Sequence, residues 1–378
     1  MNRRTLLKSA GAASLLACLP GKMPAFADAQ KAAPKATTVK TKVKTEIVRL
    51  KLRHTWTTTM SASTYRDVLF VHYQHDGITG VGEGAPIVRY KESAESARVA
   101  VSSVLPLLDA SDPTQFEKVV SEVFARVPDE WAGKAAIDIA LMDWMGKKLG
   151  VPLYEYFGLD PKDAPITDFS IGIDTPEITR QKVREAKDFP ILKIKVGLDT
   201  DEQTIAAVRS VTDKPLRVDA NEGWTDREVA ARKIDWLSRR GVQFVEQPMP
   251  ADRIEDLRWL HARSSLPLMG DESCRHPADI PKLVGVFDAL NIKLDKTGGM
   301  GQAYQMIQMA KAMGFKTMLG CMVSSSCSIT AAAHLSPLVD YADLDGNLLV
   351  DNDPYRGVTV DHGKLILPDR PGLGLLPA

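Results

Sequence analysis

The sequence predicts an α/β fold in which a (β/α)8-type barrel follows an N-terminal α+β capping domain. After about residue 163, eight short apolar segments alternate with helical patterns, which is the rhythm of a barrel built from βα units. Before that point, strand-like segments and glycine-rich turns precede a run of helical patterns, which is typical of a separate α+β domain. A chain of 378 residues, 44% of them hydrophobic, is long and apolar enough for two domains.

Residues 1–27 predict a twin-arginine signal peptide, and therefore a periplasmic protein. Arg3 and Arg4 precede an apolar run over residues 10–19, and small residues on either side of Phe26 provide a cleavage site after Ala27. The apolar run is too short to span a bilayer, so we expect no transmembrane span in the mature form.

The cysteines offer one alternative at the N-terminus and no structural role elsewhere. Cys18 ends a segment that resembles a lipobox, which leaves open cleavage before Cys18 and a lipid-anchored form. Residues 28–44, rich in Ala, Lys and Thr, are typical of a flexible leader. The other cysteines are odd in number and lack Cys-x-x-Cys spacing, which argues against a disulfide framework or a zinc site: Cys274, Cys321 and Cys327.

The net charge of the chain argues against partners that bind through a large overall charge of one sign. Lys+Arg and Asp+Glu are both 48, so the formal net charge is zero, and we expect no nucleic acid and no anionic membrane as partner. A small ligand must then be recognised by local residues. The sequence leaves the oligomeric state open, a homo-oligomer included.

The capping domain is predicted over residues 45–162. A strand-like segment and a Thr/Ser-rich loop lead to the apolar run 68–73, and the glycines that follow it indicate the turns of a small antiparallel sheet. Three helical stretches come next, with apolar residues at three- and four-residue spacing: 92–108, 113–127 and 132–149.

The barrel is predicted over residues 163–350, with an incomplete last unit. The tail over residues 351–378 is expected to return to the capping domain and complete it. The eight predicted strands are 167–173, 192–197, 216–221, 244–247, 268–272, 289–294, 317–322 and 341–345.

Two lysines on one predicted strand suggest a general base. Lys193 and Lys195 are two residues apart in the apolar segment 191–197, so their side chains point to the same face of the strand. Burial and mutual repulsion lower the pKa of a lysine, which suits proton abstraction from carbon. An edge strand with both lysines in solvent is the alternative, and it is the more common outcome for an isolated Lys-x-Lys.

Charged residues at the ends of successive predicted strands decide between these alternatives. They recur every 22 to 27 residues, which places them at the carboxyl ends of the strands, where barrel enzymes do their chemistry: Lys195, Asp219, Glu246, Asp271 and Lys293. A single acidic residue is usually a helix cap or an ion-pair partner. Three carboxylates in phase, without histidine or cysteine, predict an oxygen-only Mg²⁺ site made by Asp219, Glu246 and Asp271.

This arrangement predicts a 1,1-proton transfer. Strands two and six lie on opposite sides of a barrel, so Lys195 and Lys293 should face each other across the metal. One lysine removes a proton from carbon, the metal stabilises the charge that develops on a carboxylate, and the other lysine delivers a proton to the opposite face. We expect these two lysines, with Lys193 beside them, to form the catalytic group that inverts the configuration.

Six segments carry a family resemblance: Gly82–Pro86, Asp219–Glu222, Glu246–Pro248, Asp271–Cys274, Asn291–Gly299 and Leu319–Met322. They resemble the enolase superfamily and, within it, the dipeptide epimerases, the group typified by L-Ala-D/L-Glu epimerase. The resemblance runs from about residue 45 to the C-terminus. It implies an enolase-like barrel, Mg²⁺ as cofactor, and an isomerase that inverts the C-terminal α-carbon of an L-Ala-X type dipeptide through a metal-stabilised enolate.

Asp343 and Asp345 are the feature that points to dipeptides within this superfamily. Their i, i+2 spacing at the end of the eighth predicted strand puts both carboxylates on one side. The resemblance implies that they bind the terminal ammonium of the substrate by charge-assisted hydrogen bonds. A turn before Gly346 is the alternative interpretation of the same residues.

One departure from the family's pattern bears on the second residue of the dipeptide. Members that prefer glutamate carry an arginine in the loop after the first capping strand, whereas residues 57–64 contain no basic residue. We therefore hypothesise N-terminal Ala, or another small residue, followed by a neutral residue; Ala-Glu as the best of a dipeptide panel by kcat/KM would contradict this. Two rival functions stay open: another reaction on the same scaffold, such as a cycloisomerase or acid-sugar dehydratase, and a non-catalytic exported binding protein.

Overall fold

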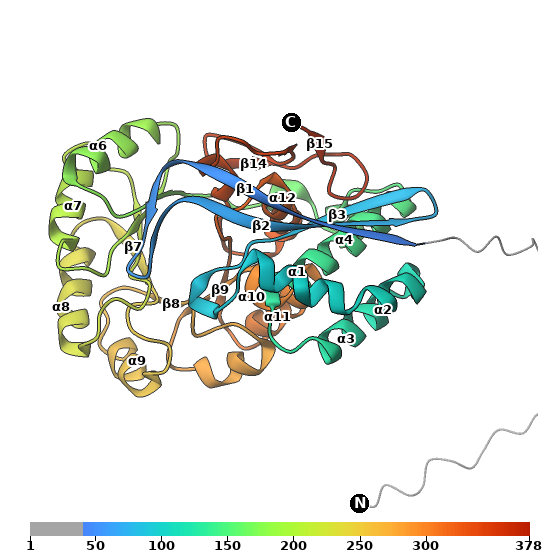
Figure 1. The fold of residues 1–378 in the computed structure, drawn as a ribbon. Coiled ribbons are helices and arrows are strands. Elements are labelled where there is room, and N and C mark those ends of the chain that lie inside the picture. The colour runs from blue at the N-terminus through green and yellow to red at the C-terminus, as the bar shows by residue number, and fades with distance from the viewer. Residues whose placement is uncertain (1–40) are drawn as a thin grey trace, which may run out of the picture. The chain divides into compact units, whose positions relative to one another are not determined.

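The computed structural model describes residues 41–378 (Figure 1). The predicted signal peptide, Cys18 and the leader up to residue 40 lie outside the described residues. Export, the cleavage site and lipid attachment therefore stay predictions, which N-terminal sequencing of the exported protein would check. Within the described part of the chain, no helix combines the length and the apolar character needed to cross a membrane.

Three long antiparallel strands and four helices make up the capping part of the chain. The strands pair in the order β1-β2-β3 and are longer than predicted. The pairing of β1 with β2 continues beyond a register shift and ends only where Thr57 pairs with Ala62. Their bounds are Lys42–Thr57, Ala62–His75 and Ile78–Gly84. The helices are α1 (Ala94–Ser103), α2 (Leu105–Ala110), α3 (Phe116–Arg126) and α4 (Trp131–Leu149).

Glycines at alternate positions of β3 let helix α4 lie directly on the strand. A Cβ atom at any of the three, Gly80, Gly82 or Gly84, would lie 2.0 Å from a backbone carbonyl oxygen of α4. The three oxygens belong to helix residues that are four positions apart, which is about one helical turn. Two residues along the strand therefore match about one turn of the helix. The sequence analysis interpreted these glycines as turns; the structure places them inside a strand, where a close backbone approach requires them.

Eight parallel strands form the barrel, in chain order from β4 to β11. Each overlaps its predicted segment, and a bridge between Thr167 and Ala342 nearly closes the ring between the first and last strands. The strands are β4 (Phe169–Ile171), β5 (Leu192–Lys195), β6 (Leu216–Asp219), β7 (Val242–Glu246), β8 (Leu268–Gly270), β9 (Ala289–Ile292), β10 (Lys316–Gly320) and β11 (Tyr341–Asp343).

Helices follow most of the strands and lie outside them, as α6 to α9 show in Figure 1. The segment after β8 is different: a 3-10 helix, η4 (Pro277–Leu283), stands there, and Pro281 inside it removes a backbone donor that an α-helix needs. The α-helices are α6 (Pro176–Glu185), α7 (Asp201–Arg209), α8 (Arg227–Ser238), α9 (Ile254–His261), α11 (Met300–Ala312) and α12 (Ser326–Leu335). Short helices complete the connections: η1 (Val88–Tyr90), η2 (Pro113–Gln115), α5 (Leu153–Tyr156), η3 (Pro161–Asp163), α10 (Leu294–Thr297), η5 (Ser336–Leu338) and η6 (Gly346–Leu349).

The C-terminal tail returns to the capping part of the chain, as predicted. The backbone N–H of Gly372 donates to the Val151 carbonyl at 2.9 Å, and that of Asp351 donates to the Lys51 carbonyl at 2.9 Å. The tail forms two small antiparallel ladders, β12 (Tyr355–Arg356) with β15 (Leu376–Pro377) and β13 (Thr359–Asp361) with β14 (Lys364–Ile366). The boundaries assigned to the two domains stay predictions.

Buried carboxyl groups join the capping elements to the barrel. Glu83 of β3 accepts hydrogen bonds from the backbone of Ser325 at 2.8 Å and Ser328 at 3.0 Å, at the start of α12. Asp138 of α4 accepts one from the backbone of Met300 at 2.5 Å, at the start of α11. Helix N-termini favour carboxylates, but burial dominates and raises the pKa of both Glu83 and Asp138 to about 7.

Asp138→Asn is expected to make the stability of the protein less dependent on pH. Because burial raises the pKa of Asp138 to about 7, with Glu117 adding to the shift, the folded state holds the proton more tightly than the unfolded chain. The stabilising contribution of Asp138 is therefore fully present below about pH 4 and is lost as pH rises through about 7. Thermal unfolding should show a decrease in Tm from about pH 5 to about pH 8 that is smaller in the variant by about 2–5 °C. Asp109→Asn, at an exposed site, should match wild type; equal pH slopes for wild type and Asp138→Asn would contradict the prediction.

Candidate functional site

Strand β5 brings its two lysines to different depths of the barrel. Lys195, at the end of the strand, lines a cavity, whereas Lys193 is fully buried and does not line it. The Nζ atom of Lys193 lies within 3.3 Å of three carboxylates, at 2.6 Å from Asp343, 2.8 Å from Glu246 and 3.3 Å from Asp219. The position of Lys193 suits holding these carboxylates in place, and its assignment to the catalytic group stays a prediction.

Carboxylates from other strands raise the pKa of the buried lysines. Burial alone lowers the pKa of Lys193, but Asp343 and the other two carboxylates outweigh it and raise the pKa well above its ordinary value. The same holds for Lys293, where Asp271 opposes burial most strongly. For Lys193, the expectation that burial and a neighbouring lysine lower the pKa is wrong, because it did not count partners on other strands.

Three adjacent strands bring the predicted metal ligands together. Asp219 and Glu246 are in register across β6 and β7, and Asp271 directly follows β8. One carboxylate oxygen from each lies within 4.8 Å of the others, and all three side chains are buried. Glu246 Oε2, apart from its contact with Lys193, accepts no hydrogen bond from the described residues. An all-carboxylate donor set of this size suits Mg²⁺, so the residues present fit the predicted ion.

Burial and neighbouring charges shift the pKa values of Glu246 and Asp271 in opposite directions. Burial, followed by the charge of Asp219, raises the pKa of Glu246 to about 7. Burial acts on Asp271 too, but Lys293 and Lys296 outweigh it and hold its pKa below the ordinary value. A divalent cation between the carboxylates favours the ionised form of each of them.

Lys293 follows β9 and has two buried neighbours that the sequence analysis missed. Its Nζ donates to Asp271 Oδ2 at 2.8 Å. Lys296 Nζ donates to the other oxygen of Asp271 at 2.5 Å, and Asn291 Nδ2 donates to Glu246 Oε1 at 2.8 Å. Asn291 and Lys296 both lie in the segment of residues 291–300, in which every residue is buried. The burial of these polar side chains is visible only in the structure, so no local sequence signal identifies them.

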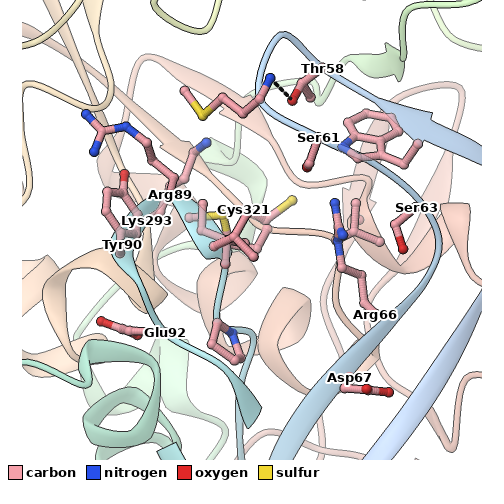
Figure 2. A pocket seen from close by; sticks show the side chains of 18 of the residues that line it. Thr58, Ser61, Ser63, Arg66, Asp67, Arg89, Tyr90, Glu92, Lys293 and Cys321 are labelled. Atoms are coloured by element: carbon pink, nitrogen blue, oxygen red, sulfur yellow. Dashed lines mark hydrogen bonds between the residues drawn. The ribbon is translucent and has the colours of Figure 1, made fainter. Parts of the chain in front are cut away.

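Lys195 and Lys293 approach one cavity from opposite sides. Their strands, β5 and β9, are four positions apart in the eight-stranded order, which is half of the ring. Both lysines line a cavity of about 570 Å³ between the barrel and the capping elements. Figure 2 shows Lys293 in this cavity, close to Tyr90 of the capping elements and Cys321 at the end of β10.

Asp343 and Asp345 both line the same cavity, at the end of β11. Ser170 Oγ donates to Asp343 at 3.2 Å, and the backbone N–H of Ser170 donates to Asp345 at 2.6 Å. Asp345 precedes the helix η6, but its side chain makes no capping hydrogen bond to that helix. Burial, then the charge of Asp343, raises the pKa of Asp345 to about 7. A cation placed beside Asp345 would stabilise its ionised form.

Two capping segments bind the same barrel loop. After β1, Thr59 Oγ1 donates to the carbonyl oxygen of Asn221 at 2.7 Å. After β3, Arg89 forms a bidentate pair with Glu222 at 2.6 and 2.9 Å. Asn221 and Glu222 have positive φ angles of 39° and 64°, and the Asn221 N–H donates to Asp219 Oδ1 at 2.9 Å. One strained turn therefore connects a predicted metal ligand to both capping segments.

Arg66 is a further cavity-lining residue that the sequence analysis missed. It lies on β2, two residues beyond the segment 57–64 that was searched for a basic residue. The structure confines the connecting loop to residues 58–61, so β2 itself carries side chains to the cavity.

Two family models match the chain. The mandelate racemase / muconate lactonizing enzyme N-terminal domain model matches residues 38–158, and the enolase C-terminal domain-like model matches residues 178–377. The first span covers the capping elements, and the second contains most of the barrel and nearly all of the tail.

Curated relatives and a solved structure are similar over most of the chain. The L-Ala-D/L-Glu epimerase of Bacteroides thetaiotaomicron is 42% identical over 86% of this chain and 85% of its own length. The L-Ala-D/L-amino acid epimerase of Pedosphaera parvula is also 42% identical, over 85% of this chain and 94% of its own. The dipeptide epimerase of Enterococcus faecalis, solved with Mg and L-Leu-L-Tyr, has a TM-score of 0.83 and 33% identity, covering 89% of this chain and 99% of that one.

Proposed function

Because the chain belongs to the enolase superfamily, in the family of mandelate racemase and muconate lactonizing enzyme, we propose that it is a magnesium-dependent dipeptide epimerase of the L-Ala-X type. The observation that carries the proposal is the pair Lys195 and Lys293 on opposite sides of one cavity, each bonded to a carboxylate that fits a metal site. The relatives that are 42% identical support the same reaction class, since both are epimerases of L-Ala dipeptides.

The two lysines supply the proton transfers. Whichever of Lys195 and Lys293 faces the α-hydrogen removes it as the neutral amine, and the other, as the ammonium, donates a proton to the opposite face. The neighbouring carboxylates raise the pKa of Lys293 and favour its ammonium form, and a divalent cation held by those carboxylates would offset that effect. Mg²⁺, when bound by Asp219, Glu246 and Asp271, supplies stabilisation of the negative charge that develops on the substrate carboxylate. Lys193 holds Asp219, Glu246 and Asp343 in position by ion pairs, so we assign it a positioning role beneath the cavity.

Asp343 and Asp345 bind the substrate's terminal ammonium in this proposal. Both carboxylates line the cavity, and their present partners leave room for further acceptor bonds.

Asp345→Asn is expected to raise KM for dipeptides by roughly 10- to 100-fold, because a charge-assisted hydrogen bond to the ammonium is weakened. The measurement is steady-state epimerisation of an L-Ala-X dipeptide. Asp361→Asn, at an exposed site of the tail, is the control and should leave KM unchanged. An unchanged KM in Asp345→Asn would contradict the ammonium site and favour a substrate without an amine.

The function itself is tested by proton NMR of the purified mature protein with Mg²⁺ in D₂O. The substrates are Ala-Glu, Ala-Phe, Ala-Leu and Ala-Ala, and the signal is loss of the C-terminal residue's α-proton together with growth of a diastereomer. Both changes, abolished by EDTA, are the expected result. No exchange on any dipeptide would overturn the proposal and turn attention to other reactions of the same scaffold.

A further inference from the structure

Asp168 is a fully buried carboxyl group that the proposed mechanism does not use. It directly precedes β4, and its side chain points to the same face of that strand as Ser170, two residues further on. Its Oδ2 atom accepts a hydrogen bond from Arg217 Nη1 of β6 at 2.8 Å. Its Oδ1 atom is buried and accepts no hydrogen bond from a donor in the described part of the chain. A buried carboxylate oxygen without a donor is costly, so this oxygen needs an explanation.

The neighbour of Asp168 is a second carboxyl group, Asp343 at the end of β11. The two side chains are hydrogen-bonded to each other, where the first and last strands of the barrel meet. Asp343 also accepts a hydrogen bond from Lys193 Nζ at 2.6 Å and one from Ser170 Oγ at 3.2 Å. Two ionised carboxylates have no donor between them, so a hydrogen bond that joins them requires one proton.

The surrounding charges indicate which of the two groups carries that proton. Burial and the charge of Asp343 raise the pKa of Asp168 well above its ordinary value, and Asp345 adds to the rise. Arg217 and Lys193 oppose this shift but do not cancel it. Burial acts on Asp343 as well, but Lys193 and the two cavity lysines outweigh it and hold the pKa of Asp343 below its ordinary value. Asp168 is therefore the acid of the pair, and Asp343 is the carboxylate.

Arg217 has enough other partners to remain charged beside a neutral acid. Its Nη1 atom also donates to the carbonyl oxygen of Ala342 at 2.8 Å. Its guanidinium carbon lies 5.4 Å from the ring centre of Phe244 and 5.2 Å from that of Tyr341. Carbonyl oxygens and aromatic faces both stabilise a guanidinium. The charge of Arg217 therefore does not require an ionised Asp168.

We propose that Asp168 is a neutral acid that donates a hydrogen bond to Asp343 and so positions Asp343 as a charged carboxylate of the ammonium site. This inference rests on the proposed function, which assigns the substrate's ammonium to Asp343 and Asp345. Asp168 does not line the cavity, so it acts on the substrate only through Asp343. As a neutral donor it fixes the orientation of Asp343 without adding a third negative charge beside the two carboxylates.

The proton itself is tested by infrared difference spectroscopy of the mature protein without substrate, at a pH above the ordinary carboxyl range. The difference between wild type and Asp168→Asn is expected to contain the C=O stretching band of a protonated carboxyl group. Asp188→Asn, at an exposed site before β5, is the control and should give no such band. Absence of the band from the Asp168→Asn difference would overturn the inference, whatever substrate the protein turns over.

The positioning role is tested by steady-state epimerisation of an L-Ala-X dipeptide. Asp168→Asn keeps a donor for Asp343 and should leave KM and Tm close to those of wild type. Asp168→Ala loses the donor and is expected to raise KM by roughly 10-fold, the effect of one hydrogen bond to a charged group. The change in kcat should be smaller, because ammonium binding rather than proton transfer is affected. Asp188→Ala is the matched control and should leave KM unchanged.

Two kinetic results would overturn the inference while leaving the epimerase proposal intact. One is an Asp168→Asn variant that fails to fold or shows the same rise in KM as Asp168→Ala, because Arg217 would then need the charge of Asp168. The other is an unchanged KM in a folded Asp168→Ala. If Asp168→Ala fails to fold, as judged by its thermal unfolding, the infrared band and Asp168→Asn decide. Absence of turnover on every dipeptide in wild type would overturn the proposed function and the positioning role together, whereas the infrared band would still decide where the proton lies.

Discussion

Lys195→Ala and Lys293→Ala are each expected to abolish epimerisation, with a loss of at least about 10³-fold, because each removes the only base on one face of the α-carbon. Each variant should nevertheless retain exchange of the α-proton with D₂O for one diastereomer, the one whose hydrogen faces the remaining lysine. The two variants should retain exchange for opposite diastereomers. Proton NMR of each diastereomer, followed separately in D₂O, measures both effects.

Lys316→Ala is a matched control for these variants. Lys316 also belongs to a barrel strand, but it is exposed at the amino end of β10 and pairs with Asp340 at 2.6 Å. The amino ends of barrel strands contribute to stability rather than chemistry, so this variant should epimerise like wild type. Full epimerisation in either cavity-lysine variant would refute the two-base scheme.

Removal of the metal is expected to stop turnover as completely as loss of a lysine. EDTA should abolish exchange and epimerisation, and added Mg²⁺ should restore them. Glu246→Gln should weaken Mg²⁺ binding by more than about 10- to 100-fold, since that is the loss typical of residues one step removed from a metal. The direct readout is the Mg²⁺-dependent increase in Tm, which does not depend on activity.

Glu228→Gln, at an exposed position of α8, is the control for the metal experiment and should bind Mg²⁺ like wild type. Turnover that persists in EDTA, or an unchanged Mg²⁺ dependence in Glu246→Gln, would show that the three carboxylates have another role.

The barrel and the convergence of its three carboxylates could be predicted from the sequence because the relevant signals are local and repeat. Parallel strands buried on both faces are short apolar segments, and one strand plus one helix sets the interval at which strand ends recur. Asp219, Glu246 and Asp271 keep that interval, so their convergence follows from the repeat. The same reasoning placed Lys195 and Lys293 on opposite sides of the mouth.

The depth of each side chain could not be predicted in this way. Lys193 and Lys195 share a face of β5, but only the folded barrel distinguishes the lysine that lines the cavity from the one beneath it. The partner that holds Lys193 most closely, Asp343, is 150 residues away in the chain. No local pattern reports such a contact, and for this reason the direction of the pKa shift of Lys193 was predicted wrongly.

The sequence by itself thus determined the strand order, the cluster of three carboxylates and the pair of lysines on opposite sides of the barrel, since each depends on periodicity along the chain. The tertiary structure alone decided which residues of the capping elements reach the cavity. Arg66 is on the long strand β2, just beyond the segment in which a loop was expected, and Thr59 and Arg89 bind Asn221 and Glu222 across more than 130 residues of chain. Contacts between elements that are distant in sequence depend on how whole layers pack, and packing is a property of the assembled fold.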